Sequence, residues 1–179
     1  MAARHLCIRL LLLVLFGAHA ALASVEETCA KACASSGGGG HDAGLTAFCV
    51  ASLQAAPGSG GADARGLAAI ATNLTLANYT AAVATVKALE RRGGWSAPAR
   101  GALATCRRRY IEALNVVHSA VHALAAGRDG DYVADMGVVM SAATDCEDAF
   151  GSGGDGAMRK VNEDAIGLTT VAMLIVKSL

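Results

Sequence analysis

The chain has little of what β-proteins and nucleic-acid-binding proteins use. Its 179 residues include only two prolines and seven aromatic side chains, whereas alanine fills 40 positions. Because alanine favours helices and aromatic residues favour strands, this composition argues against a β-sandwich. Fifteen Lys and Arg balance fifteen Asp and Glu, and no long block of one sign stands out. We therefore expect neither nucleic acid nor a membrane as a partner.

The first 23 residues have the pattern of a secretory signal peptide. Arg4 and Arg9 precede an apolar run, 10–16, and small residues follow it up to the A-x-A pattern at 21–23. This run is shorter than the ~20 residues that cross a bilayer. We expect cleavage before Ser24 and a secreted mature chain, with thirteen basic and fifteen acidic residues.

The rest of the chain is expected to be all-α and to fold as one domain. Glycine-rich breaks separate four amphipathic segments, which predict helices at 63–92, from about Ser96 to Gly127, at 131–150 and at 157–179. Four helices with short connections pack most simply as an up-down-up-down bundle over 63–179. Two shorter apolar segments, 25–34 and 45–55, predict a helical hairpin within 24–62.

The spacing of apolar residues predicts which side of each of the first three bundle helices is buried. For the first helix the predicted stripe is Leu67, Ile70, Leu74, Ala77, Ala81, Ala84 and Ala88. For the second it is Leu103, Cys106, Tyr110, Ala113, Val117, Ala120 and Leu124. For the third it is Val133, Met136, Met140, Ala143, Cys146 and Phe150.

Secretion makes disulfides the expected state of the cysteines. Cys106 and Cys146 fall on the predicted seams of neighbouring helices, so they are expected to pair inside the bundle. In the hairpin, Cys49 has two candidate partners, Cys29 and Cys33, of which Cys29 is preferred. A Cys29–Cys49 bridge would stabilise the small hairpin by roughly 3 kcal/mol.

Other motifs in the chain are weaker. Asn73 and Asn78 each begin a glycosylation sequon. His118 and His122 are four residues apart on one helix, but no third ligand has suitable spacing, so we expect no metal site. The residues 151–156 match G-x-G-x-x-G but follow a helix instead of a strand, which favours a linker. No nucleophile, base and oxyanion donor are grouped, so we expect neither catalysis nor a cofactor.

Taken together, several segments of the mature chain resemble the plant invertase and pectin methylesterase inhibitor family. The similar segments surround the cysteines and the start of the bundle, and they are 28–29, 48–53, 62–68, 102–106 with Tyr110, and 141–150. The resemblance implies a hairpin joined to a four-helix bundle, with the first two and the last two family cysteines paired. It also implies a non-catalytic cell-wall (apoplast) protein that covers the substrate cleft of a carbohydrate-active enzyme in a 1:1 complex.

The resemblance leaves two unrelated targets, pectin methylesterase and acid invertase. Several invertase inhibitors of the family have a Pro-Lys-Phe segment at the start of the third bundle helix, where this chain has Gly130, Asp131 and Tyr132. An acid in place of a lysine reverses the electrostatics, so we expect pectin methylesterase to be the target. The alternatives are an invertase inhibitor and a structural or signalling bundle without an enzyme target.

Binding to the target is expected on the outward side of the second and third bundle helices, near the break between them. The candidate contact residues are Arg107, Arg108, Asp131, Tyr132 and Asp135. Alanine at Tyr132 or Asp135 is expected to weaken inhibition without lowering the melting temperature.

Overall fold

The computed structural model describes residues 24–34, 43–151, 156 and 158–179. These described residues contain no β-strand. The helices of the hairpin are α2 (Val25–Ala34) and α3 (Ala43–Gln54), followed by a 3-10 turn, η1 (Ser59–Gly61). The helices of the bundle are α4 (Ala64–Arg92), α5 (Ala97–Ala125), α6 (Asp129–Phe150) and α7 (Arg159–Lys177). The expected signal peptide lies outside the described residues.

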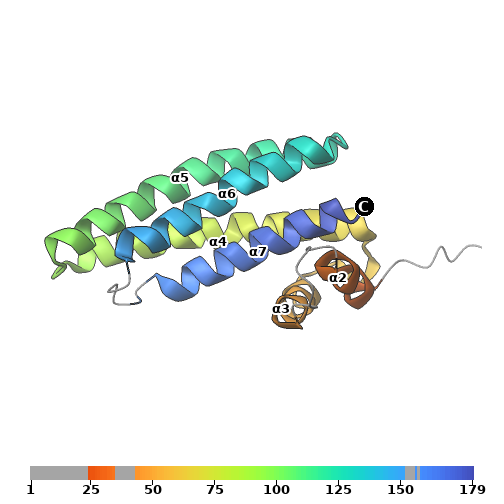
Figure 1. Cartoon of the computed structure of the whole chain (residues 1–179), viewed down its shortest axis with the longest axis horizontal. Helices are drawn as coiled ribbons and strands as arrows, with labels where there is room; N and C mark the ends of the chain where they lie inside the picture. Colours follow the sequence, from red (N-terminus) through yellow and green to blue (C-terminus); the bar gives the residue numbers. More distant parts are fainter. Residues whose placement is uncertain (1–23, 35–42, 152–155, 157) are drawn as a thin grey trace, which may run out of the picture.

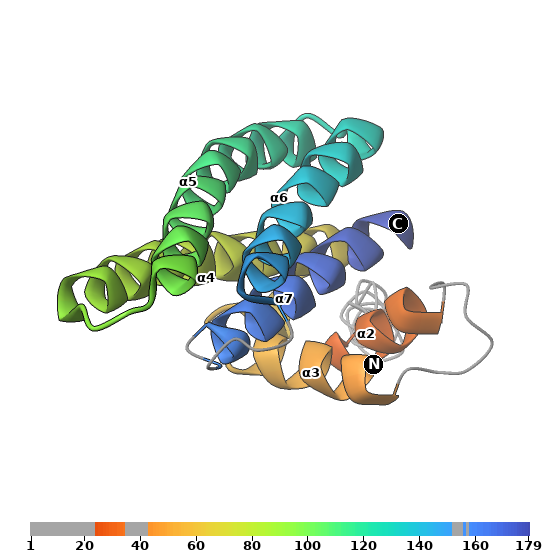
Figure 2. The ribbon, with the colours of Figure 1, turned by 60° about the vertical axis from the view of Figure 1, so that its left-hand side comes forward.

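The four long helices form the expected antiparallel bundle, with the hairpin packed beside it (Figures 1 and 2). Two of them begin at side-chain caps that the sequence contains. Asp63 accepts a hydrogen bond from the backbone N–H of Gly66 at the start of α4 (2.7 Å), and Ser96 accepts one from Ala99 at the start of α5 (3.3 Å). These bonds satisfy backbone donors that have no partner within the helix.

The buried side of α5 agrees with the predicted stripe, but that of α4 does not. All seven predicted residues of α5 are buried. In α4, the predicted members Ala77, Ala81, Ala84 and Ala88 are exposed. The buried residues are instead Leu67, Ala68, Ala71, Thr72, Thr75, Tyr79, Ala82, Val83 and Val86.

Hydrogen bonds explain why the buried side of α4 includes polar residues that the predicted stripe leaves out. The hydroxyls of Thr72 and Thr75 donate to carbonyls one turn earlier in the same helix. The hydroxyl of Tyr79 donates to the carbonyl of Val139 on α6 (2.8 Å), and burial raises its pKa to about 12. Since a buried hydroxyl with a partner loses little on leaving water, these side chains can be part of the core, and the four alanines of the predicted stripe face solvent.

Both disulfides of the described chain staple pairs of antiparallel helices. Cys29 on α2 is joined to Cys49 on α3, with 5.8 Å between their Cα atoms. Cys106 on α5 is joined to Cys146 on α6, with 4.5 Å between their Cα atoms. Cys33 is buried and belongs to neither bridge, so the alternative pairing Cys33–Cys49 is not the one in the structure.

The hairpin lies on the outer side of α7, which is therefore covered on two sides. Six consecutive residues near the C-terminus, Val171 to Val176, are all buried. Gly167 permits the close approach of α3, because a Cβ atom at this position would lie 2.8 Å from the ring of Phe48.

α4 is the only described helix long and apolar enough to cross a membrane, and much of its surface is buried in the bundle.

Candidate inhibitory surface

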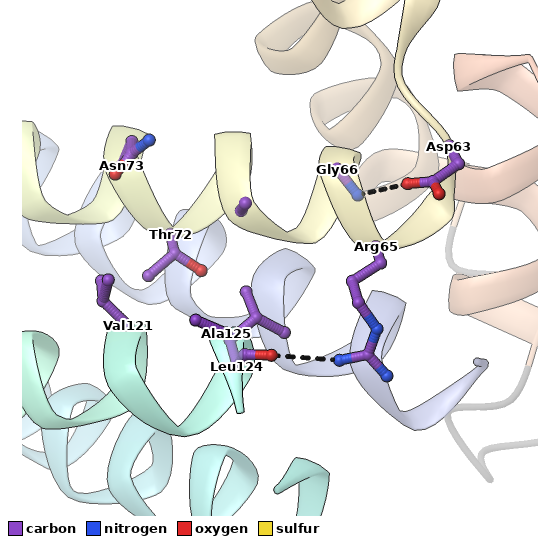
Figure 3. A pocket seen from close by; sticks show the side chains of 9 residues that line it. Asp63, Arg65, Gly66, Thr72, Asn73, Val121, Leu124 and Ala125 are labelled. Atoms are coloured by element: carbon purple, nitrogen blue, oxygen red, sulfur yellow. Dashed lines mark hydrogen bonds between the residues drawn. The ribbon is translucent and has the colours of Figure 1, made fainter. Parts of the chain in front are cut away.

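The turn between α5 and α6 is fixed to the start of α4 by an arginine fork. Arg65 donates from both terminal nitrogens to the two carboxylate oxygens of Asp129, at 2.8 and 2.9 Å. It also donates to the carbonyl of Leu124 at the end of α5 (3.3 Å), as Figure 3 shows. One side chain therefore connects three helices, and a bidentate fork of this kind fixes their orientation as well as their distance.

This ion pair shifts both of its partners toward their charged forms. The hydrogen bond from Arg65 lowers the pKa of Asp129 below its ordinary value, and the same bond raises the pKa of Arg65. Both side chains remain over a third exposed. The pair thus forms a rigid, charged part of the surface at the end of the bundle.

A groove of about 360 Å³ lies beside this pair, between α4 and α5. Its lining is mainly apolar, and Figure 3 shows the side chains that form it. These are Asp63, Arg65, Gly66, Ala69, Thr72, Asn73, Val121, Leu124 and Ala125. Sequence reasoning missed this groove and the arginine fork, because both depend on residues more than 45 positions apart.

Tyr132 was expected on the outward surface, and this expectation is wrong. Its side chain is fully buried, and its hydroxyl lies 2.7 Å from that of Thr72 on α4. Burial raises its pKa to about 12. The reason is that α6 packs against more than one helix, so its buried side is wider than the predicted stripe and includes the aromatic ring.

The other four candidates do not form one patch either. Asp131 is exposed at the turn, where its carboxylate pairs with Arg128 (3.2 Å), and Asp135 is half-buried one turn further along α6. Arg107 and Arg108 lie about 25 Å away along α5, at 1.5 Å per residue. They pair with Glu90 (3.4 Å) and Glu112 (3.1 Å) respectively. The candidate surface at the turn therefore keeps the two aspartates and excludes the two arginines.

The titratable groups of the described residues suit binding, and no catalytic constellation is found among them. His118 and His122 are exposed on α5. Among the described residues, no three His, Cys, Asp or Glu side chains come together as a metal site would require. The surface at the turn is held in place by the Arg65–Asp129 pair, and it has charged edges and an apolar groove.

Comparison with known proteins agrees with this description. No curated protein sequence matches the chain significantly. Two solved structures have the same fold: a pectin methylesterase inhibitor from Arabidopsis thaliana (TM-score 0.60) and a mutant form of a pectin methylesterase inhibitor from Arabidopsis (TM-score 0.64). Each is 19% identical and aligns with 74% of this chain, covering 87% of the former and 88% of the latter.

The family model described as plant invertase/pectin methylesterase inhibitor matches residues 23–175. This span includes both disulfides, the hairpin and nearly all of the bundle. The chain therefore belongs to the plant invertase/pectin methylesterase inhibitor family, and it is an enzyme inhibitor without catalytic activity of its own.

Proposed function

We propose that the protein is secreted to the plant cell wall and inhibits pectin methylesterase by covering its substrate cleft in a 1:1 complex. The observation that carries this proposal is the chemistry at the start of α6. Where several invertase inhibitors of the family have Pro-Lys-Phe, this chain presents an exposed carboxylate, Asp131, followed by a tyrosine that is locked in the core. Neither a cation nor an aromatic ring can enter a cleft from these two positions.

Rigidity of the turn supports binding by surface complementarity. The Arg65–Asp129 pair holds α4 to α6 at the turn, and the Cys106–Cys146 bridge joins α5 to α6 at the far end of these helices, before any partner arrives. A preformed surface loses less conformational entropy on association, so more of its contact energy contributes to affinity. A standard interface would need about 800 Å² on each partner, to which the α5–α6 turn and the start of α6 can contribute.

Parallel titrations test the choice of target. Purified residues 24–179 are added to pectin methylesterase and to acid invertase, and the residual activity of each enzyme is measured. The proposal predicts inhibition of the esterase that is complete at equimolar protein, with invertase unaffected. The reverse result would make the protein an invertase inhibitor, and inhibition of neither would favour a structural or signalling bundle.

Substitutions test the position of the surface. Asp131→Ala combined with Asp135→Ala is expected to raise the inhibition constant about tenfold, because both side chains lie at the proposed interface. Asp148→Ala serves as the matched control, since it removes an exposed aspartate from the far end of α6. Equal inhibition constants for all three proteins would place the interface elsewhere.

We also propose that Asn73, rather than Asn78, carries a glycan. The side chain of Asn73 is exposed at the edge of the groove, whereas the amide oxygen of Asn78 is buried without a hydrogen-bond partner in the described chain. Mass spectrometry of the secreted protein tests this directly. Finding the glycan on Asn78, or on neither residue, would contradict it.

A further inference from the structure

The net charge of the whole chain is zero, but one segment at one end of the bundle is strongly basic. Residues 87–109 contain seven Lys or Arg and a single acid, Glu90, which gives a formal charge of +6. The remaining residues from Ser24 onward contain six basic and fourteen acidic side chains, which give −8. The mature protein is therefore strongly polarised although its net charge is near zero.

The fold concentrates this charge on a projecting tip. The basic segment covers the last turns of α4, the α4–α5 connection and the first half of α5. Figures 1 and 2 both show this connection extending past the ends of α6 and α7, at the opposite end of the bundle from the C-terminus. The tip is thus accessible and well separated from the α5–α6 turn.

Four of the seven cations on this segment have no carboxylate partner among the described residues. Arg107, Arg108 and Arg109 each form ion pairs, with Glu90, Glu112 and Asp145. In contrast, no described acid lies within ion-pair distance of the other four, all of them exposed: Lys87, Arg91, Arg92 and Arg100. Their charge is available to an external anion.

A single tryptophan orders the two arginines that flank the α4–α5 connection. The guanidinium carbon of Arg92 lies 4.7 Å from the centre of the Trp95 ring, and Arg100 donates to the backbone carbonyl of Trp95 (2.7 Å). The indole N–H of Trp95 donates in turn to the carbonyl of Leu89 at the end of α4 (2.7 Å). Both guanidiniums are therefore placed on a preformed turn, with planar donors suited to carboxylates.

We infer that this tip is a second binding site, which takes an acidic polysaccharide whose sugars carry carboxylates. The choice of polymer rests on the proposed function, because removal of methyl esters from pectin leaves polygalacturonate. A row of exposed cations on a projecting element suits a long polyanion, from which binding releases counterions. The site would retain the inhibitor on wall regions where the esterase has already acted.

Binding to immobilised polygalacturonate at low salt, with no enzyme present, tests this inference. The wild-type protein is expected to bind polygalacturonate and to release it as the salt concentration rises. It is expected not to bind fully methyl-esterified pectin. Arg92→Gln with Arg100→Gln is expected to weaken binding about tenfold and to reduce its salt dependence. Arg92→Lys with Arg100→Lys keeps the charge but loses the planar donors, so it should bind more weakly than the wild type and more tightly than the Gln variant.

A matched control removes two charges from the other end of the molecule. Lys31→Gln with Lys177→Gln is expected to bind like the wild type, and equal melting temperatures would show that all variants are folded. Unchanged binding by the Arg92→Gln, Arg100→Gln variant would overturn the inference, as would equal binding of esterified pectin. The inference would also be overturned if this variant bound the polymer normally and associated more weakly with pectin methylesterase, because the tip would then contact the enzyme.

The outcome is independent of the proposed target. Complex formation between the protein and pectin methylesterase can be measured by calorimetry without pectin. Polymer binding without enzyme inhibition would refute the proposed function and keep the second site, and inhibition without polymer binding would do the opposite.

Discussion

Removing the bridge between α5 and α6 is expected to destabilise the whole bundle. Cys106 and Cys146 are fully buried and 40 residues apart in sequence, so the bridge closes a loop of 41 residues. In the chain-entropy model this loop stabilises the folded state by about 4 kcal/mol. For a domain of this size, such a loss lowers the melting temperature by about 10 °C. Far-UV circular dichroism of the Cys106→Ala, Cys146→Ala variant measures the shift.

The bridge in the hairpin provides the comparison. Cys29 and Cys49 are 20 residues apart, and their loop is worth about 3 kcal/mol in the same model. Because this bridge lies outside the bundle, its removal should loosen α2 and α3 before α4 to α7 unfold. A reducing agent should lower the melting temperature of the wild type toward that of a variant without both bridges. A melting temperature within about 2 °C of the wild type for Cys106→Ala, Cys146→Ala would refute the reasoning.

Three further predictions concern single residues. Tyr132→Ala is expected to lower the free energy of unfolding, measured in urea, by about 3–5 kcal/mol, and Tyr132→Phe is expected to lower it by about 1 kcal/mol. An unchanged free energy of unfolding for Tyr132→Ala would mean that the ring is not in the core. Arg65 lowers the pKa of Asp129 from its ordinary value of 3.8, so the pair stabilises the fold above that value, and its contribution is lost as pH falls through the lowered pKa. The stability difference between wild type and Asp129→Asn should therefore shrink in unfolding curves below about pH 4, and a difference that grows there would contradict the assignment. Gly167→Ala should lower the free energy of unfolding by about 1–3 kcal/mol, because the added methyl group pushes the phenylalanine ring of α3 away. Gly137→Ala has open space at its Cβ position, so it should leave the stability unchanged or raise it slightly. Equal effects of the two substitutions would contradict the close approach of α3 to Gly167.

Helix positions could be predicted from the sequence because their signals are local. Ser96 with Pro98 marks the start of α5, and the glycine at 127 follows its end closely. The bounds of α4 and α6 differ from the expected ones by one or two residues. Caps, glycine breaks and periodicity all act within a few residues of the chain, so they can be read without knowing the tertiary structure.

The rotation of the helices could not be predicted in the same way. In α4 the alanine stripe was as regular as the true one, and only long-range hydrogen bonds, such as that of Tyr79 to α6, decide between them. In α6 the same uncertainty placed Tyr132 outside. The fork between Arg65 and Asp129 joins residues 64 positions apart, so no local pattern signals it. The hydrophobic period identifies a helix, whereas tertiary partners determine which of its sides is buried.

The packing of the hairpin against α7 has a consequence for how the chain is made. The hairpin is synthesised before α7, yet each covers apolar surface of the other. Until α7 has left the ribosome, α2 and α3 lack most of the surface on which they dock. Their disulfide joins residues close in sequence and can form early, which would keep the hairpin compact during this delay. Folding of α7 therefore completes the bundle and the docking surface of the hairpin at once, and chains truncated before α7 should aggregate.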